Sequence, residues 1–543
     1  MKFSSLPRTL ALEALSFREA VRAGLFRLDR PTVFYRGVRG MRTYGPMGGV
    51  LVFSGERYPD RAAVVDELGT LTYGELLARA TALANTWLDD GFAAGSGIGI
   101  LARNHRGFVE ASFAAAMIGA RLIYLNTDFG GPAIVDVCER EGIDILVVDQ
   151  GYAPLVEGVR TRGGTYLAWI EDPSTLGTTP TLESAIASGS TALPPKPAAQ
   201  AKVIILTSGT TGRPKGTERP NPRSLIPVGG LFVKVPYRSG GVLEACPPFF
   251  HSLGYAQLML GITLGMTVVM RRYFDPAATL ASIERNKVTM LAAVPVMLQR
   301  IVDLGPEARA GLDLSSLSVV LSGGSQLGAD LAVRVTEAFG PVLRNLYAST
   351  EVAYVSIASP EELAIHPGTV GSAFLGSTVK ILDDTGRELP VGETGRIFVA
   401  NGVQFSGYTG GGGKEIVGGL MSSGDVGHFD ENGLLFVDGR DDEMIISGGE
   451  NLFPGEVEEC LAAHPGVLEV AAIGVPDEEF GARISVFIVR GPQGSDLTED
   501  DVRTYVRSTL ARFKVPRDVT FLEELPRNPA GKVLKRVLVD LDA

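Results

Sequence analysis

Lys215 closes a stretch of glycine and hydroxyl residues that could hold an anion. The stretch follows an aliphatic run from Val203 to Leu206, and its members are Thr207, Ser208, Gly209, Thr210, Thr211, Gly212, Arg213, Pro214 and Lys215. Glycines let the backbone fold closely around an anion, while hydroxyl and ammonium groups donate hydrogen bonds to it. The order differs from a Walker A loop, which ends in Gly-Lys-Ser/Thr. The stretch predicts a phosphate site, with a plain surface turn as the alternative.

Five further segments carry side chains that could take part in catalysis or ligand binding. They are Pro247-Pro248-Phe249-Phe250-His251, Tyr347-Ala348-Ser349-Thr350-Glu351, Ser423-Gly424-Asp425 with Gly439-Arg440, and Asn528-Pro529-Ala530-Gly531-Lys532. Taken singly, each has a simpler interpretation. A lone histidine in an apolar stretch is more often a core residue, Thr-Glu begins helices, Ser-Gly-Asp forms turns, and a lysine after glycine is usually solvated.

Short aliphatic runs alternating with helical segments must position these residues. Ile98 to Leu101, Leu122 to Leu125 and Ile145 to Val148 predict strands, and helices are expected between them, which indicates parallel βαβ units. Later segments, including a hairpin around Asn432-Gly433, predict β structure. The last hundred residues predict a small α+β module, in which Thr498 caps a helix that has Asp501 at its third position.

Composition limits the possible classes of protein. A chain of 543 residues is too long for one core, so at least two domains are expected. The net charge of −12 argues against general nucleic-acid binding. Cys138, Cys246 and Cys460 are far apart, which predicts neither a zinc nor a redox site and suits a reducing cytoplasm. No signal peptide and no apolar run of membrane-spanning length is apparent.

The motifs, taken together and in order, resemble those of the adenylate-forming superfamily: acyl-CoA synthetases, luciferases and the adenylation domains of peptide synthetases. The resemblance covers about residues 50 to 537 and is greatest to bacterial fatty acyl-CoA synthetases. It implies an α/β fold with a large N-terminal domain of βαβ-type sheets, a β-barrel-like subdomain, and a small mobile α+β C-terminal domain. The expected divisions are a basic N-terminal extension (1–47), the large domain (48–439), a hinge (440–442) and the small domain (443–543).

The resemblance also implies roles for individual residues, with ATP, Mg²⁺ and coenzyme A as ligands. The glycine-rich stretch and Lys215 would hold phosphates, Tyr347 would stack on adenine, and Asp425 and Arg440 would bind ribose. Thr350 would contact the α-phosphate, Glu351 would hold Mg²⁺, and Lys532 would swing into the active site. The remaining implied residues are His251 near the substrate carboxylate, Asp442 at the hinge, Gly448 and Gly449 near CoA, and Gly323, Gly324, Ser325 and Ala348 near the acyl group. Ser325 and Ala348 depart from the family pattern.

The function expected from these assignments is that of an AMP-forming acyl-CoA ligase, an acid–thiol ligase acting on a medium- or long-chain fatty acid. Three alternatives stay open: a fatty acyl-AMP ligase that loads a carrier protein, an aryl-CoA ligase, and a non-catalytic nucleotide- or lipid-binding protein. The oligomeric state is not fixed by the sequence, and a homodimer is compatible with it.

Residues 2 to 42 carry nine lysines and arginines against three acidic residues, an excess of six positive charges in an acidic chain. Apolar residues from Leu12 to Leu28 predict a helix that ends before Pro31. Packing of this helix on the acidic body of the protein is the favoured interpretation. A weak peripheral contact with anionic membrane lipid is the alternative.

Overall fold

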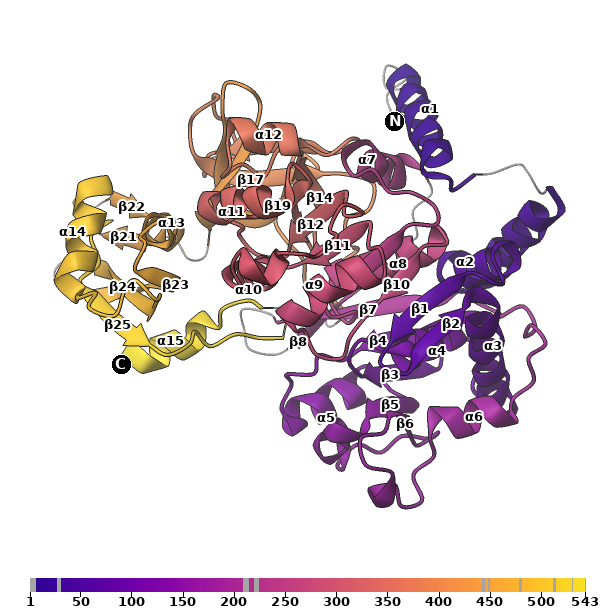
Figure 1. The fold of residues 1–543 in the computed structure, drawn as a ribbon. Coiled ribbons are helices and arrows are strands. Elements are labelled where there is room, and N and C mark those ends of the chain that lie inside the picture. The colour runs from indigo at the N-terminus through magenta and orange to yellow at the C-terminus, as the bar shows by residue number, and fades with distance from the viewer. Residues whose placement is uncertain are drawn as a thin grey trace. The chain divides into compact units, whose positions relative to one another are not determined.

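The computed structural model describes residues 6–26, 31–208, 214–218, 224–409, 411–441, 445–447, 450–477, 481–510, 514–529 and 531–542. Figure 1 shows the helices and strands that these residues form, and the chain divides into two units. The first comprises residues 1–293, 303–321 and 402–413, and the second comprises residues 294–302, 322–401 and 414–543. The chain thus passes between the units several times.

The first unit is built from alternating strands and helices, as the sequence predicts. Its helices are α1 (Leu6–Ala23), α2 (Pro31–Arg57), α3 (Tyr73–Asp89), α4 (Arg106–Met117), α5 (Gly131–Arg140), α6 (Leu182–Ser188), α7 (Ile226–Lys234), α8 (Ser252–Thr263) and α9 (Pro276–Arg285). Its strands are β1 (Ala62–Asp66), β2 (Gly69–Thr72), β3 (Gly97–Leu101), β4 (Arg121–Tyr124), β5 (Ile145–Asp149), β6 (Thr165–Trp169), β7 (Lys202–Ser208), β8 (Pro214–Glu218), β9 (Val242–Ala245), β10 (Thr267–Val269) and β11 (Met290–Ala293).

The strands of the first unit form two sheet regions. In one, the order is β6-β5-β3-β4-β7-β8, parallel except for the antiparallel pair β7–β8. In the other, β1, β10, β9 and β11 run parallel and β2 pairs antiparallel with β1. The central strands β3 and β5 are buried along their whole length, which explains their continuous aliphatic sequences.

Local signals explain where the helices begin. Thr72 accepts a hydrogen bond from the backbone N–H of Glu75, and the Glu75 carboxylate accepts one from the N–H of Thr72, so a capping box starts α3. Helix α2 kinks at Gly45, whose φ is 75°, immediately before Pro46. The predicted boundary at residue 48 therefore falls inside a helical segment.

The second unit begins with mixed elements and ends in the small α+β module. Its helices are α10 (Pro295–Asp303, the last residue of which belongs to the first unit), α11 (Ala329–Phe339), α12 (Pro360–Ile365), α13 (Pro454–Ala462), α14 (Glu499–Thr509) and α15 (Lys535–Asp542). Its strands are β13 (Leu343–Ser349), β14 (Ala353–Ala358), β15 (Ser372–Ala373), β16 (Thr378–Leu382), β17 (Gly395–Ala400), β18 (Ile416–Val417), β19 (Leu420–Phe429), β20 (Leu435–Arg440), β21 (Ile445–Ser447), β22 (Glu450–Leu452), β23 (Val467–Asp477), β24 (Gly481–Arg490) and β25 (Asp518–Leu522). Strand β12 (Val319–Gly323) begins in the first unit and ends in the second.

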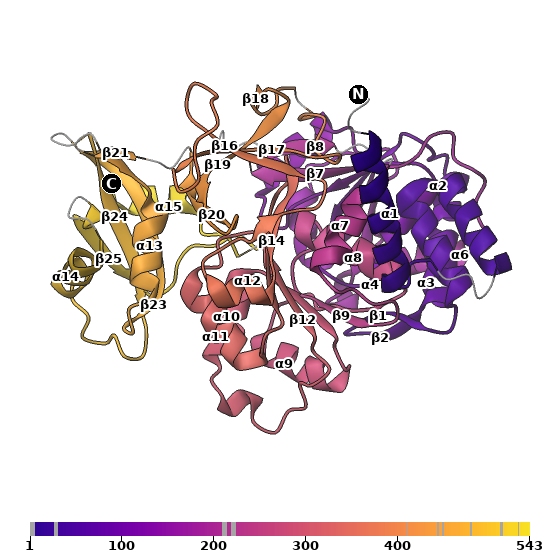
Figure 2. The same cartoon turned by 90° about the horizontal axis from the view of Figure 1, so that it is seen from above.

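Two sheets of the second unit confirm the expected β-rich region and α+β module. Strands β16, β17, β19, β18 and β20 form a five-stranded antiparallel sheet. The predicted hairpin joins β19 to β20, and Gly433 adopts a φ of 75° in its turn. In the module, β23 and β25 flank β24, and apolar side chains from α13 and α14 cover the sheet. Figure 2 shows β23, β24 and β25 beside α13 and α14.

Candidate functional site

The pair β19–β20 positions a carboxylate and a guanidinium directly opposite each other. Asp425 on β19 is in register with Arg440 on β20, and the Arg440 guanidinium donates a hydrogen bond of 3.3 Å to Asp425 Oδ1. Tyr347, near the end of β13, donates its hydroxyl to Asp425 Oδ2 at 2.5 Å. Three residues that the sequence predicts for one nucleotide site therefore meet in the second unit.

Burial sets the electrostatics of this cluster. Burial raises the pKa of Asp425 above its ordinary value of 3.8, although Arg440, Tyr347, Lys414 and Lys532 each lower it. Burial also raises the pKa of Tyr347, and the neighbouring Asp425 raises it further. The Tyr347 hydroxyl therefore stays protonated and donates a hydrogen bond to Asp425. Asp425 itself accepts few strong hydrogen bonds from the protein. Such a carboxylate can accept two hydroxyl donors from a ligand.

Lys532 lies close enough to this cluster to affect the titration of Asp425. Two hydrogen bonds between Asn528 and Lys532 close this loop. The side-chain oxygen of Asn528 accepts one from the backbone N–H of Lys532, and the backbone N–H of Asn528 donates the other to the carbonyl of Lys532. Gly531 has a φ of 78°, and a Cβ at this position would lie 2.4 Å from Val296 Cγ1. The loop therefore contacts α10 closely, and a side chain at position 531 would push it away.

Thr350 and Glu351 lie in the turn between β13 and β14, so the helix start that a Thr-Glu pair alone would suggest is not found here. The Ser349 hydroxyl accepts hydrogen bonds from the backbone N–H groups of Glu351 and Val352. Ala353, which follows, has a positive φ of 60°, a conformation that costs free energy for a non-glycine residue. The turn holds Thr350 and Glu351 at the end of the strand that carries Tyr347 and Ala348.

Gly323 is the last residue of the buried strand β12, and Gly324 and Ser325 follow it at the carboxyl end of the strand. A Cβ on Gly323 would lie 2.9 Å from the carbonyl oxygen of Leu346, so the glycine permits close packing on β13. Gly324 has a φ of 94°. Both glycines are thus required by the backbone, as the sequence suggests, which by itself does not assign them to a ligand.

In the first unit, Lys215 lies on β8, opposite Thr207 on β7. Its ammonium group is 5.1 Å from the centre of the Tyr408 ring, a cation–π contact. For Thr207 and Ser208 the structure describes the backbone pairing. Gly209, Thr210, Thr211 and Gly212 of the predicted phosphate loop lie outside the described residues, as do Asp442, Gly448 and Gly449.

His251 precedes helix α8 and is partly buried. Its Nε2 atom is buried and has no hydrogen-bond partner among the described residues. Burial lowers the pKa of His251 to about 4, so the imidazole is neutral at physiological pH. A buried polar atom without a partner is costly, which makes this nitrogen a candidate for a hydrogen bond to a ligand. The arrangement supports a hydrogen-bonding role and not that of a proton carrier.

The sequence analysis missed Lys414. A Cβ on Gly424 would lie 2.9 Å from Lys414 Nζ, and Lys414 lowers the pKa of Asp425 more than Lys532 does. Lys414 follows a run of glycines that belongs to no recognised motif, so no sequence signal marked it. The cluster thus combines three cations, Arg440, Lys414 and Lys532, with one carboxylate.

A divalent cation would find few protein ligands here. No group of three or more histidine, cysteine or acidic side chains suited to a metal occurs in the described part of the chain. Glu351 is a hard-oxygen ligand of the kind that Mg²⁺ shares with substrate phosphates, and one carboxylate is sufficient for that mode. The residues therefore fit a metal brought with a nucleotide and not a metal held by protein alone.

Comparison with known proteins gives two matches to family models. The model described as AMP-binding enzyme matches residues 53–409, and the model described as AMP-binding enzyme C-terminal domain matches residues 456–532. None of the described helices is long and apolar enough to cross a membrane.

Similar proteins act on different acids. A feruloyl-CoA synthase of Amycolatopsis is 32% identical over 491 residues, covering 88% of this chain and 96% of the relative. The fatty acid–[acyl-carrier-protein] ligase ScoC of Streptomyces coeruleorubidus is 28% identical over 509 residues, covering 90% and 95%. The solved structure of o-succinylbenzoate CoA synthetase from Bacillus subtilis, in complex with its acyl-adenylate intermediate, has a TM-score of 0.77 and 25% identity, covering 90% and 97%.

Proposed function

Because the chain belongs to the AMP-binding enzyme family, we propose that it ligates a medium- or long-chain fatty acid to coenzyme A through an acyl-adenylate. The observation that carries this proposal is the meeting of Tyr347 and Arg440 at Asp425, with Lys532 near enough to lower the pKa of that carboxyl group. A buried acceptor, an aromatic ring and cations in one place are what an adenosine monophosphate unit requires.

In the first step, an oxygen of the fatty acid carboxylate attacks the α-phosphorus of ATP. The bond from this phosphorus to the bridging oxygen breaks, and pyrophosphate leaves. Since both reactants are anions, the step requires fixed positive charge, which we assign to Lys532. Asp425 would accept hydrogen bonds from the ribose hydroxyls, and Tyr347 would stack on the adenine. Mg²⁺, bound with the nucleotide at Glu351, would supply further charge neutralisation.

In the second step, the thiol sulfur of coenzyme A attacks the acyl carbon, the bond to the phosphate oxygen breaks, and AMP leaves with the thiol proton passing to solvent. Withdrawal of Lys532 by a turn at Asp442, with Gly448 and Gly449 approaching the pantetheine tunnel of CoA, is proposed from the sequence alone. Lys215 and His251 belong to the first unit, and their proposed places at the phosphates and at the substrate carboxylate also rest on the sequence.

The fatty acid substrate is supported by the composition of the segments expected to contact the acyl group. Residues 255–260, 292–297 and 323–327 contain no charged side chain, and an apolar lining favours a hydrocarbon tail. The fatty acid ligase ScoC among the relatives agrees with such a tail, whereas the feruloyl and succinylbenzoate enzymes favour an aryl acid as the second candidate. We further propose a cytoplasmic location, in which Cys138, Cys246 and Cys460 stay reduced.

A panel of acids tests the substrate class. ATP-dependent pyrophosphate release is measured with decanoate, palmitate, benzoate and ferulate, followed by CoA-dependent AMP release in the absence of any carrier protein. We expect the fatty acids to be preferred and CoA to accept the acyl group. Preference for ferulate would favour the aryl-CoA ligase, and AMP release only with a carrier protein would favour the acyl-AMP ligase. No pyrophosphate release with any acid would favour a binding protein.

The variant Lys532→Ala tests the central role. Removing this charge should slow adenylate formation by about 100- to 1,000-fold, while turnover of supplied acyl-adenylate with CoA stays near the wild-type rate. Lys535→Ala is the control, because Lys535 is a neighbouring lysine that pairs with Glu458. Equal loss of both half-reactions in Lys532→Ala would contradict the role assigned to the lysine.

A further inference from the structure

Helix α1 exposes a stripe of large apolar side chains to solvent. Leu10, Phe17 and Val21 are 63%, 52% and 43% exposed. Their spacing of seven and four residues places them on one side of the helix. Isolated exposed apolar residues are common on protein surfaces, but a row along one helix is a different feature that calls for an explanation.

Other residues of α1, outside this stripe, make the contacts that hold the helix in place. Glu13 accepts a hydrogen bond from the backbone N–H of Leu225, and a Cβ on Gly229 would collide with Ser16. Figures 1 and 2 show α1 beside α7, which contains Gly229. The helix packs on its own protein, as expected, and in the described part of the chain it does so on the small and apolar residues of α7. The exposed stripe is not needed for this packing.

The stripe continues onto the beginning of α2. Phe17 stacks on Phe26 with ring centres 5.3 Å apart, and Phe26 contacts Phe34 edge to face at 6.4 Å. Tyr35, the next residue, is 69% exposed. The aromatic contacts therefore join α1 and α2 into one surface, which we call the N-terminal surface and define by Leu10, Phe17, Val21 and Tyr35.

Positive charge borders this surface. The side chains of Arg18, Arg22 and Arg36 are 73%, 68% and 68% exposed, and Arg39 and Arg42 are also exposed. The buried Glu19 pairs with Arg18 and Arg22, and Glu56 pairs with Arg36 at 3.5 Å. The cations lie on a chain whose net charge is −12, so they are a local feature and not a consequence of composition.

We propose that the N-terminal surface docks on the anionic face of a lipid bilayer. An amphipathic helix with arginines beside aromatic and aliphatic residues fits the boundary between lipid headgroups and acyl chains. A second copy of the chain fits less well, because a two-fold interface would set the same arginines of both copies against each other. This contact is independent of the ligation reaction and requires no catalytic residue.

Co-sedimentation of the full chain with lipid vesicles tests the proposal. One set of vesicles is pure phosphatidylcholine, and the other contains about 30% phosphatidylglycerol, which supplies negative surface charge. We expect binding to the anionic vesicles, with at least tenfold weaker binding to the neutral ones and a marked loss at 1 M salt, where the screening length falls to about 3 Å. Absence of binding to anionic vesicles, or equal binding to both sets, would overturn the proposal.

A triple variant, Leu10→Ser, Phe17→Ser and Val21→Ser, locates the contact. It should reduce binding to anionic vesicles by about tenfold or more, since the apolar area that enters the headgroup region is lost. The matched control changes Leu68, Ile365 and Val391 to serine, because these side chains are 61%, 61% and 62% exposed but lie elsewhere in the sequence. Equal loss in both variants would overturn the assignment to α1. So would a wild-type dimer, measured by light scattering, that becomes monomeric only in the stripe variant.

Discussion

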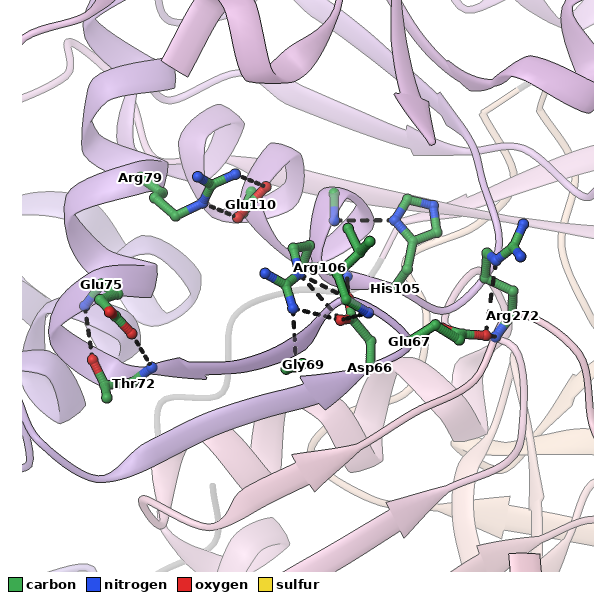
Figure 3. Close-up of polar contacts among 12 residues, drawn as sticks. Asp66, Glu67, Gly69, Thr72, Glu75, Arg79, His105, Arg106, Glu110 and Arg272 are labelled. Atoms are coloured by element: carbon green, nitrogen blue, oxygen red, sulfur yellow. Dashed lines mark hydrogen bonds and ion pairs between the residues drawn. The ribbon is translucent and has the colours of Figure 1, made fainter. Parts of the chain in front are cut away.

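Asp66 in the first unit and Asp425 in the second are both buried aspartates beside an arginine, yet their surroundings differ. Arg106 donates to both oxygens of Asp66 through Nε and to Oδ1 through a terminal nitrogen at 2.6 Å, and its backbone N–H donates as well (Figure 3). Leu68 N–H adds another bond. Asp425 receives one guanidinium contact of 3.3 Å from Arg440 and one hydroxyl from Tyr347.

The titration of the two carboxyl groups follows this difference. Burial raises the pKa of both aspartates, but at Asp66 the contacts with Arg106 outweigh burial and the net pKa is lowered. At Asp425 burial dominates and the net pKa is raised. Both oxygens of Asp66 accept hydrogen bonds from within the fold. Asp425 is buried with fewer such bonds, so its oxygens can accept further hydrogen bonds from a ligand. A saturated carboxylate stabilises a structure, and an undersaturated one is suited to a ligand.

The largest effect should come from breaking the saturated pair. Asp66→Ala leaves the Arg106 guanidinium largely buried without its partner, which should destabilise the protein by about 3 to 5 kcal/mol. The midpoint of guanidinium-induced unfolding measures this, and pyrophosphate release per folded molecule should be unchanged. Asp60→Ala, at an exposed site nearby in the sequence, is the control. A normal midpoint for Asp66→Ala would remove the contrast between the two aspartates.

The second effect concerns the undersaturated aspartate. Asp425→Asn removes a buried charge, while the remaining Arg440 is partly exposed and can be hydrated. The unfolding midpoint should stay the same or rise at pH 7. The KM for ATP should increase about 10- to 100-fold, which corresponds to the free energy of a hydrogen bond to a charged group. A fall in the midpoint as large as that of Asp66→Ala would show that Asp425 is structural.

Which of these features the sequence predicts depends on the distance along the chain between the interacting residues. The helix cap at Thr498 with Asp501 and the hairpin at Gly433 involve residues within a few positions, and both predictions are confirmed. Family membership and enzyme class could be predicted because several motifs occur in order. The matches to the family models confirm both.

Contacts between distant residues could not be predicted in this way. Asp66 and Arg106 are 40 residues apart, and Tyr347 and Asp425 are 78 apart. The motifs suggested that Tyr347 and Asp425 share a ligand, but nothing indicated that they bond to each other. The place of Lys414 in the cluster follows only from the fold, which brings its side chain close to Gly424. The assignments of the remaining site residues stay predictions.

A smaller effect is expected from the hydroxyl that Asp425 already accepts. Tyr347→Phe keeps the ring proposed to stack on adenine and removes one neutral donor, so the KM for ATP should change by less than about tenfold. Tyr347→Ala, which also removes the ring, should have a larger effect. If both variants were equally impaired, the hydroxyl and not the ring would be the important group, and the acceptor capacity of Asp425 would be already committed.

The smallest effect, and the most direct one on the comparison, is the response of stability to acid. The folded-state pKa of Asp66 lies below 3.8, so the stability it contributes is present above that pH and is lost as the pH falls through the lower folded value. The folded-state pKa of Asp425 lies above 3.8, so its ionisation costs stability at neutral pH, and this cost disappears as the pH falls toward 3.8.

Unfolding midpoints of the wild type and Asp425→Asn should therefore converge between pH 7 and about 4, whereas the gap between the wild type and Asp66→Asn should persist over that range and narrow only below it. Parallel curves for the two variants would mean that both carboxylates are equally saturated, and the distinction between a structural and a ligand-binding aspartate would not hold.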